Sequence, residues 1–502
     1  MGRPGAARTS REPDKMKPIS LLVAAVVMQA GCTMAPRYER PAAPAPGAWP
    51  KGPAYPEQAA ADAGPAVPAA ELGWREFFVE PRLAKLLELA LSNNRDLRVA
   101  VLNVELSRAQ YRIQRAALLP SVSANALGSR QRIPSGVSGF NQPLEYTEYS
   151  LNAGVIAYEL DLFGRVRSLK AEALNRYLAT KEGRKAAQIA LVAEVAIQYL
   201  AEREMDEQLS VARQTLKAVE DSYGLNKRSF ENGIASELDL RSAEAQVETA
   251  RANVAALTQL EAQAENALVL LLGCPLPSDL PAPKPLESQS VRAEVPEGLP
   301  SDLLRRRPDI VQAEYQLQAA NADIGAARAA FFPRIILTGA AGASSLRLED
   351  LFKGSAKAWN FSPQITVPIF DAGNNRANLD ASKVSKLIEV ANYEKAIQTA
   401  FREVADALAA RAMIGRQLAA LEALVKAEQR RYDLAELRYR HGVDSYLTVL
   451  LAQQDLYNAQ QNLIHSRSAR LSSLVTLYKA LGGGWLEHTT NRKPATGNET
   501  KS

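Results

Sequence analysis

The stretch that decides the fold is Phe230-Glu-Asn-Gly-Ile-Ala-Ser-Glu-Leu-Asp-Leu240, because the chain repeats its pattern as Tyr439-Arg-His-Gly-Val-Asp-Ser-Tyr-Leu-Thr-Val449. In each version a glycine that can close one helix in the left-handed conformation stands three residues before a serine that can cap the next helix. Each version therefore predicts a tight turn between two antiparallel helices. The two turns lie 209 residues apart (442 − 233).

The repetition extends through most of the chain. Before the strand-like segments the shift is 213 (333 − 120), and it relates Asp96, Ala100, Ala109, 115–117 and Pro120 to Asp309, Ala313, Ala322, 328–330 and Pro333. After those segments the shift is 209, and it relates Tyr223, Gly233, Ser236, Leu238, Ala243, Ala250, Asn253 and Gly273 to Tyr432, Gly442, Ser445, Leu447, Ala452, Ala459, Asn462 and Gly482. Two copies of one unit favour a tube built by symmetry over a pocket built for chemistry.

The N-terminus has the pattern of a secretory signal. An apolar run over Ile19–Met28 follows two lysines and is too short to span a bilayer permanently. The small residues before Cys32 are similar to a bacterial lipobox, although Gln29 stands where leucine is usual. We expect removal of residues 1–31 and acylation of Cys32, with a plain secretory signal as the alternative. Met16 is a more natural start for this signal than the first methionine.

Composition argues against nucleic-acid binding and against a metal or cofactor site. The formal charge is +5, but residues 1–31 hold five basic and two acidic residues, which leaves 55 basic and 53 acidic, about +2. Cys274 has no cysteine partner once Cys32 is acylated. His441, His465 and His488 form no ligand spacing, and no glycine-rich phosphate loop occurs. We therefore expect no nucleic-acid partner, no cofactor, no metal and no enzymatic activity.

The predicted organisation has five parts: residues 1–31 as signal, 32–70 as an acylated Pro/Ala-rich linker without a core of its own, 71–290 and 291–485 as the two repeats, and 486–502 as a disordered tail. Each repeat is expected to contain a helix, two strands and two long helices. The strands fall at about 120–160 and 333–370, the turns near 233 and 442, and the return helices end near 273 and 482.

The strand-like segments alternate between polar and apolar residues. After Pro120, Ser121 and Ser123 alternate with Val122 and Ala124. Four such segments of about ten residues have the length that a tilted strand needs to cross a bilayer. Two ordinary soluble hairpins are the alternative interpretation.

The long helices are continuous and carry a packing seam. Residues 165–230 contain no proline, and about 65 residues at 1.5 Å each make a rod of about 100 Å. The return helices show heptad spacing. Its positions are Leu240, Ala243, Val247, Ala250, Val254 and Leu257, and in the second copy Val449, Ala452, Leu456, Ala459 and Leu463.

Four strands cannot close a barrel, and open sheet edges are not tolerated in lipid, so one chain is incomplete. Three chains would give a twelve-stranded barrel and a tube of twelve helices, although two or four chains stay open at this point. The predicted fold class is an α+β membrane protein, a trimeric outer-membrane β-barrel continuous with a periplasmic α-barrel.

The chain resembles the outer-membrane efflux proteins of the TolC type, in their NodT-like lipoprotein branch. The resemblance covers nearly everything from Cys32 to Trp485. It rests on motifs that occur in order, at 73–78, 90–97, 159–165, 303–310, 368–373 and 481–485.

The resemblance implies a homotrimer in the outer membrane of a Gram-negative bacterium, anchored by its lipid and extending into the periplasm. It implies a passive exit duct for small molecules, such as drugs or other toxic compounds. The partners would be a periplasmic adaptor protein and an inner-membrane pump of the resistance-nodulation-division class. The alternatives are a duct for polypeptide secretion with an ATP-dependent transporter, and a non-conducting lipoprotein that braces the envelope. The lipobox and the motif at 303–310 favour small-molecule efflux over secretion.

The resemblance also implies a closed periplasmic tip held by polar links around the two turns. The matching positions are Phe230, Gly233, Ala235 and Asp239 in the first copy and Tyr439, Gly442, Asp444 and Thr448 in the second.

Thr448 departs from the acid that is frequent there, and Asp444 is expected to take over the link with Arg438, Arg440 or Arg241. Alternatively, Asp239 and Asp444 are first-turn acids favoured by the helix dipole, and Tyr439 is a packing aromatic. We interpret the basic run 305–307 as structural.

Overall fold

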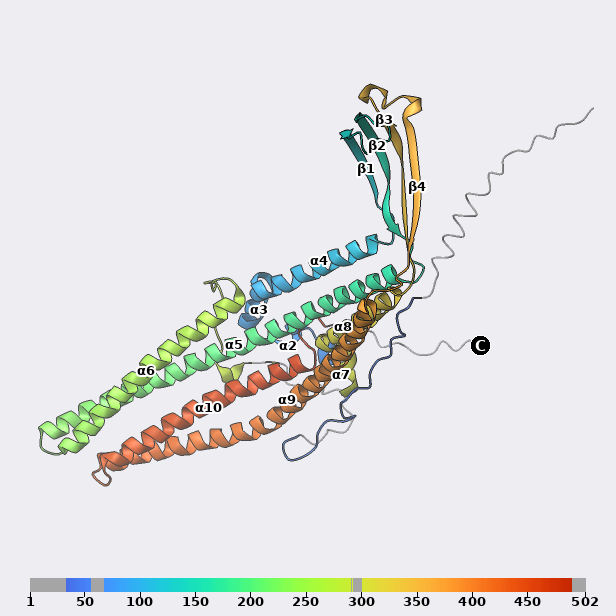
Figure 1. Cartoon of the computed structure of the whole chain (residues 1–502). Coiled ribbons are helices and arrows are strands. Elements are labelled where there is room, and N and C mark those ends of the chain that lie inside the picture. The colour runs from blue at the N-terminus through green and yellow to red at the C-terminus, as the bar shows by residue number, and fades with distance from the viewer. Residues whose placement is uncertain (1–32, 56–66, 290, 292–299, 490–502) are drawn as a thin grey trace, which may run out of the picture. The chain divides into compact units, whose positions relative to one another are not determined.

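The computed structural model describes residues 33–55, 67–289, 291 and 300–489 (Figure 1). The predicted signal peptide, Cys32 and the chain beyond residue 489 lie outside the described residues. The described chain divides into two compact units. Unit 1 comprises 33–40, 106–178 and 315–391, and unit 2 comprises the remainder.

Unit 1 contains one antiparallel sheet in the order β1-β2-β3-β4. The strands are β1 (Val122–Ile133), β2 (Leu144–Glu159), β3 (Arg334–Ser345) and β4 (Lys357–Thr366). Within one chain, β1 and β4 each have a single neighbour, so the outer edges of both are unpaired in that chain. Large apolar side chains are exposed along these strands, among them Leu127, Trp359, Phe361 and Ile365. These features are those of a barrel segment that needs neighbours on both sides.

The first copy contributes two short helices, a medium helix and a hairpin of two long helices, and the second copy contributes one short helix, a medium helix and such a hairpin (Figure 1). The helices are α2 (Trp74–Phe77), α3 (Pro81–Asn93), α4 (Arg95–Ala116), α5 (Arg165–Glu231) and α6 (Glu237–Leu272), then α7 (Pro300–Arg306), α8 (Pro308–Ala329), α9 (Asn374–Arg440) and α10 (Tyr446–Ala480). Four 3₁₀ turns complete the order: η1 (Ala69–Glu71), η2 (Leu286–Ser288), η3 (Leu348–Asp350) and η4 (Gly354–Ala356). Helices α5 and α9 contain 67 residues each, which gives rods of about 100 Å. Among the described residues no helix combines the length and the apolar character needed to cross a membrane.

The start and the end of the folded chain pack together in unit 2. The rings of Phe77 and Tyr478 stack with centroids 4.0 Å apart, and the Tyr478 hydroxyl donates to the carbonyl of Leu72 at 2.6 Å. A Cβ at Gly483 would lie 2.1 Å from the Tyr478 ring, so the glycine makes room for that ring. The motifs at 73–78 and 481–485 therefore meet in one aromatic core.

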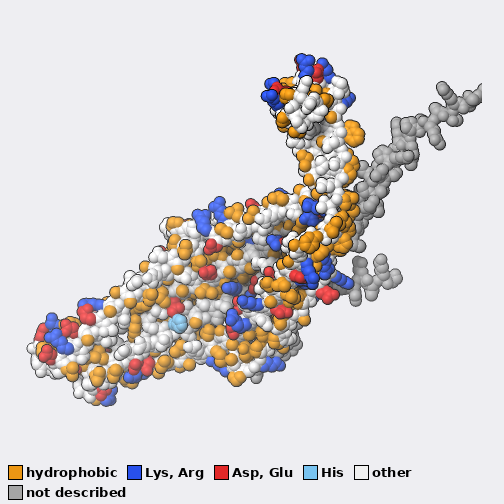
Figure 2. Space-filling view, viewed as in Figure 1, with side chains coloured by type: hydrophobic (Ala, Val, Ile, Leu, Met, Phe, Trp, Pro, Cys, Tyr) orange, Lys and Arg blue, Asp and Glu red, His pale blue; other side chains and the backbone are white. Residues whose placement is uncertain are grey.

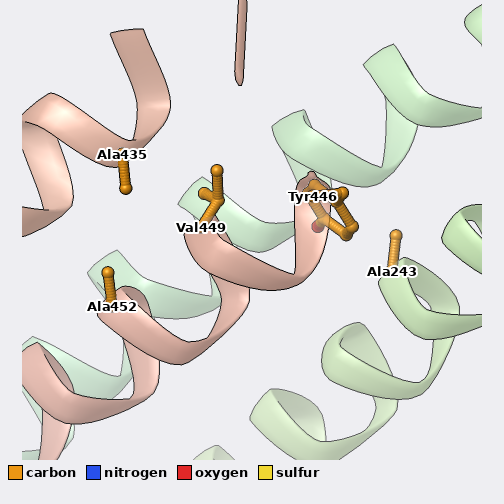
Figure 3. Packing of buried hydrophobic residues seen from close by; sticks show 5 residues of the cluster. All are labelled: Ala243, Ala435, Tyr446, Val449 and Ala452. Atoms are coloured by element: carbon orange, nitrogen blue, oxygen red, sulfur yellow. The ribbon is translucent and has the colours of Figure 1, made fainter. Parts of the chain in front are cut away.

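The predicted seam of the return helices is largely confirmed. Ala243, Val247 and Ala250 of α6 are buried, as are all five seam positions of α10, whereas Leu240, Val254 and Leu257 are half-buried. Near the turns a cluster joins both copies (Figure 3): Ala243, Ala435, Tyr446, Val449 and Ala452. Alanines in this cluster allow close approach of the helices, as heptad packing requires.

Two expectations about the chain ends need correction. The described part of the Pro/Ala-rich linker is seated on the helices, since Trp49 is buried and stacks on Phe401 of α9 at 5.0 Å. Residues 486–489, expected to belong to the tail, are bonded to the start of α2. There the N–H of Trp74 donates to the carbonyl of Leu486 at 2.9 Å. In both cases an aromatic ring or a backbone group finds a partner that composition does not reveal.

Candidate functional site

The two helix turns have the same backbone. Gly233 and Gly442 adopt φ of 71° and 73°, the left-handed conformation that the sequence predicts. The N–H of Gly233 donates to the carbonyl of Phe230 at 2.8 Å, and the N–H of Gly442 donates to that of Tyr439 at 2.9 Å. Each long helix therefore ends in an equivalent turn at the tip.

The return helices begin differently. Ser236 caps α6, because its hydroxyl accepts from the N–H of Asp239 at 3.1 Å and the Asp239 carboxylate accepts from the N–H of Ser236 at 3.3 Å. This reciprocal pair is a capping box. The predicted cap by Ser445 is wrong: its side chain makes no cap hydrogen bond, and the N–H of Thr448 donates to the Ser445 carbonyl instead. With threonine at 448, no acid is present to complete the box.

Asp444 forms the polar link expected of it, and its partner is Arg438. The Arg438 guanidinium donates through Nε and Nη2 to the two carboxylate oxygens, at 2.6 and 2.9 Å. Arg440 pairs with Glu436 and Arg241 with neighbouring acids of α6. The Arg438 hydrogen bonds hold the pKa of Asp444 below its ordinary value. This bidentate pair spans the second turn and keeps both groups charged.

Two tyrosines of the second copy bind the long helix of the first. The Tyr439 hydroxyl donates to Oδ1 of Asn226 at 2.7 Å, and the Tyr446 hydroxyl lies 3.1 Å from that of Ser222. The two rings are 5.3 Å apart, and Tyr446 is buried in the seam (Figure 3). Burial raises the pKa of both phenols, so both remain neutral. Asn226, Ser222 and Tyr446 were not predicted from the sequence. One sequence feature could have indicated this contact, because Tyr446 stands where the first copy has Glu237.

Within the described ranges of the chain, the remaining predicted tip residues form no hydrogen bond between the copies. Phe230 is partly exposed on α5, Thr448 is exposed on α10, and Asp239 is used in its own helix cap. Figure 2 shows Lys, Arg, Asp and Glu side chains gathered at the ends of the hairpins. The structure thus links Asp444 to Arg438 and Tyr439 to Asn226, which the sequence did not predict, whereas Phe230 and Thr448 bind neither. Asp239 acts on Tyr439 and Tyr446 through its charge, which adds to the effect of burial and raises the pKa of both phenols.

A second charged site lies in the basic run. Arg307 is buried and donates to the carbonyl of Ala480 at 3.1 Å, to Glu403 of α9 at 2.7 Å and to Asp309 at 2.9 Å. Burial alone would lower the pKa of Arg307, but hydrogen bonds to the two carboxylates and their charge raise it. Arg307 therefore fastens α8, α9 and the end of α10, which agrees with a structural role for the run.

The amino-acid sequence matches a family model described as outer membrane efflux protein, over residues 86–274 and 299–483. The chain belongs to that family. The two matched stretches fall in the two copies. Among the described residues of this efflux channel, no group of three His, Cys, Asp or Glu side chains is placed to hold a metal ion.

Relatives of this efflux channel are similar over nearly their whole length. It is 52% identical over 471 residues, 94% of this chain and 96% of each relative, to two proteins of Pseudomonas putida. These are the toluene efflux pump outer membrane protein TtgC and the antibiotic efflux pump outer membrane protein ArpC. Its fold is similar to the open state of the MtrE outer membrane channel of Neisseria gonorrhoeae. That match has a TM-score of 0.82 and 41% identity, and it covers 91% of this chain and 100% of the other.

These comparisons confirm the fold class, the outer-membrane location and the role as exit duct of an efflux pump. As a member of this family, the chain forms a trimeric outer-membrane channel that extends into the periplasm. It works with a periplasmic adaptor and an inner-membrane pump. The strand hairpins are therefore barrel segments rather than soluble hairpins, and small-molecule efflux is favoured over polypeptide secretion and over a bracing role.

Proposed function

We propose that this channel releases antibiotics and hydrocarbon solvents from the cell by passive conduction and catalyses no reaction. The observation that carries this proposal is the 52% identity, over 94% of the chain, to efflux channels named for toluene and for antibiotics. A duct of this kind supplies a path, and the energy for transport comes from its inner-membrane partner.

Complementation tests the cargo. A Gram-negative host that lacks its own channel but keeps the adaptor and pump is expected to regain growth on antibiotic and survival in toluene when it expresses this chain. Single-channel recording of the purified trimer supplies the second readout. Conductance without protection from either compound would refute the proposed cargo. An assembled trimer without conductance would support a bracing role.

We propose further that the tip is held closed by two links of the second copy. Arg438 and Asp444 fix the shape of the turn, and Tyr439 fastens that turn to Asn226 of the first copy. Opening moves the second hairpin away from α5 and breaks the Tyr439 hydrogen bond. We assign Asp239 no hydrogen bond in this closure, because its carboxylate accepts within the cap of α6 and only its charge reaches Tyr439.

Removal of one hydroxyl tests the link between the copies. Tyr439→Phe deletes a neutral hydrogen bond of about 1 kcal/mol, so the open state should gain about fivefold in population. The matched control is Tyr432→Phe, because Tyr432 packs against the same cluster on the same helix. Its hydroxyl makes no hydrogen bond to the described residues. Equal resting conductance in the two variants would refute the closure.

We propose that Cys32 carries a fatty acyl chain and that the two repeats divide at 71–290 and 291–485. The start of each family-matched stretch, at 86 and 299, supports the division. Mass analysis of the mature N-terminal peptide tests the acylation. An unmodified cysteine, or an N-terminus at another residue, would refute it.

A further inference from the structure

The first described residues of the chain lie across helix α8. Residues 33–36, here called the strap, pass over α8 within unit 1. Asn321 and Arg328 each donate a side-chain hydrogen bond to a strap carbonyl, at 2.8 and 3.2 Å. Between them, a Cβ at Gly325 would lie 2.7 Å from the strap nitrogen of Ala35. Glycine at this position lets the strap cross the helix at close range.

The repeat places three arginines at the matching positions of α4. Subtraction of the 213-residue shift converts 321, 325 and 328 into Arg108, Arg112 and Arg115. Their spacing of four and three residues puts all three on one helix face, here called the arginine stripe. The chain has one N-terminus and therefore one strap, which lies on α8. No described segment of the chain forms a strap across the equivalent face of α4, which carries positive charge instead.

The arginine stripe is not neutralised by the protein. All three side chains are exposed, and none forms an ion pair or side-chain hydrogen bond within the part of the chain that the structure describes. Several other arginines of unit 1 are paired, for example Arg165 with Glu159 and Arg167 with Asp161. From residue 106 to residue 144 the sequence contains no acid at all.

The stripe stands next to the membrane-spanning strands. Helix α4 ends at Ala116, and β1 begins at Val122. The strap on the equivalent face continues directly into Cys32, whose acylation we propose, and an acyl chain must enter the bilayer. Position in sequence and the acyl anchor both put this face at the level of the lipid headgroups.

The opposite side of α4 has a different character. Val99, Leu102, Leu106 and Ile113 lie there and are between 52% and 71% exposed in one chain. An apolar face of this kind is suited to contact with a neighbouring chain of the trimer. The arginine stripe, on the other side of the helix, stays available to another partner.

We propose that Arg108, Arg112 and Arg115 bind the phosphate of an anionic phospholipid headgroup in the periplasmic leaflet of the outer membrane. Guanidinium groups match phosphate oxygens in geometry as well as charge, and an anionic surface adds attraction for each basic side chain. The strap then anchors one face of each chain through its acyl group, and the stripe anchors the equivalent face through a headgroup.

Lipid retention by the full-length trimer tests this proposal. The trimer is mixed with detergent micelles that contain phosphatidylglycerol or phosphatidylcholine, and bound lipid is counted by native mass spectrometry. The test variant is Arg112→Gln/Arg115→Gln. The control is Arg95→Gln/Arg98→Gln, which removes the same charge from exposed positions of the same helix outside the stripe.

The wild type and the control should retain phosphatidylglycerol in preference to phosphatidylcholine, and the test variant should bind it about 30-fold more weakly. Equal loss in the two variants, or equal retention of the two lipids, would overturn the proposal. Displacement of the lipid by millimolar inorganic phosphate would show a free-phosphate site and overturn it too.

If the double variant does not assemble, Arg112→Gln alone should weaken retention several-fold, and retention by the wild type should fall with salt. A single variant with unchanged retention would count against the stripe. Conductance and protection from antibiotics should be the same in both double variants, so failure of this inference and failure of the proposed function are distinguishable.

Discussion

In both copies a side chain hydrogen-bonds a backbone carbonyl at the end of the return helix, but the two copies use different chemical groups. In the first copy the Asn94 amide donates to the carbonyl of Leu271 at 2.9 Å. In the second copy the equivalent residue is Arg307, which donates to the equivalent carbonyl of Ala480 and also to Glu403. The neutral Asn94 amide binds that carbonyl and accepts from the N–H of Leu97, whereas the Arg307 guanidinium fastens three helices. The two copies share one fold, and the second differs by a charge network around a buried arginine.

The two copies also use different groups at the tip. The first copy closes its return helix with the local capping box of Ser236 and Asp239. The second copy uses Asp444 to hold its own turn and Tyr439 to hold the other copy. The first copy is therefore locally self-sufficient, and the second copy carries the contacts made at longer range.

The largest effect is expected from Arg307→Met. This change leaves Glu403 and Asp309 without their cation and should destabilise the trimer by about 3 kcal/mol, at the low end for a broken buried ion pair because both carboxylates are partly exposed. The equivalent change Asn94→Ala removes two neutral hydrogen bonds and should cost about 2 kcal/mol. The thermal midpoint of trimer dissociation is measured for both variants. Equal decreases in that midpoint would contradict the difference between the copies.

A smaller difference is expected between the two N-cap serines. Ser236→Ala removes a capping hydrogen bond and should destabilise the start of α6 by about 1 kcal/mol. Ser445→Ala should change the start of α10 by no more than a few tenths of that, because its hydroxyl caps nothing. Hydrogen exchange of the first turn of each helix measures this. Faster exchange in both helices would show that Ser445 does act as a cap in solution.

The smallest effect concerns pH. Arg438 lowers the pKa of Asp444, so the link is fully present above the ordinary pKa of an aspartate, about 3.9, and is lost as the pH falls through the lowered value. Resting conductance should therefore be constant between about pH 5 and 8 and rise only in stronger acid. Asp444→Asn should raise resting conductance at neutral pH and remove this acid dependence, and Asp239→Asn should do neither. A change in the resting conductance of the wild type between pH 5 and 8 would show that a group other than Asp444 controls closure.

Local sequence patterns predicted the elements but not the long-range bonds. The left-handed glycines, the seam of α10 and the proline-free rods depend on neighbouring residues, so the sequence shows them directly. The Tyr439–Asn226 bond joins residues 213 positions apart, and nothing in the sequence around Asn226 indicates a partner. Arg438 could be distinguished from Arg440 and Arg241 only by side-chain geometry across the turn.

Two errors have a physical reason in common. Ser445 has the residue type and position of an N-cap but lacks the acid that completes the box, and Trp49 lies in a segment whose composition resembles a linker. In each case the prediction used only the neighbouring residues in the sequence. The contacts of the residue depend instead on side chains and helices that lie close to it in the folded chain.

The unpaired outer edges of β1 and β4 also have a genetic consequence. The unpaired backbone groups of a chain can be satisfied in lipid only by the chains on either side. A chain with a defective edge strand therefore spoils the barrel of two sound partners. If defective and normal copies are expressed equally and mix at random, about one trimer in eight contains three sound chains, so such an allele should be dominant.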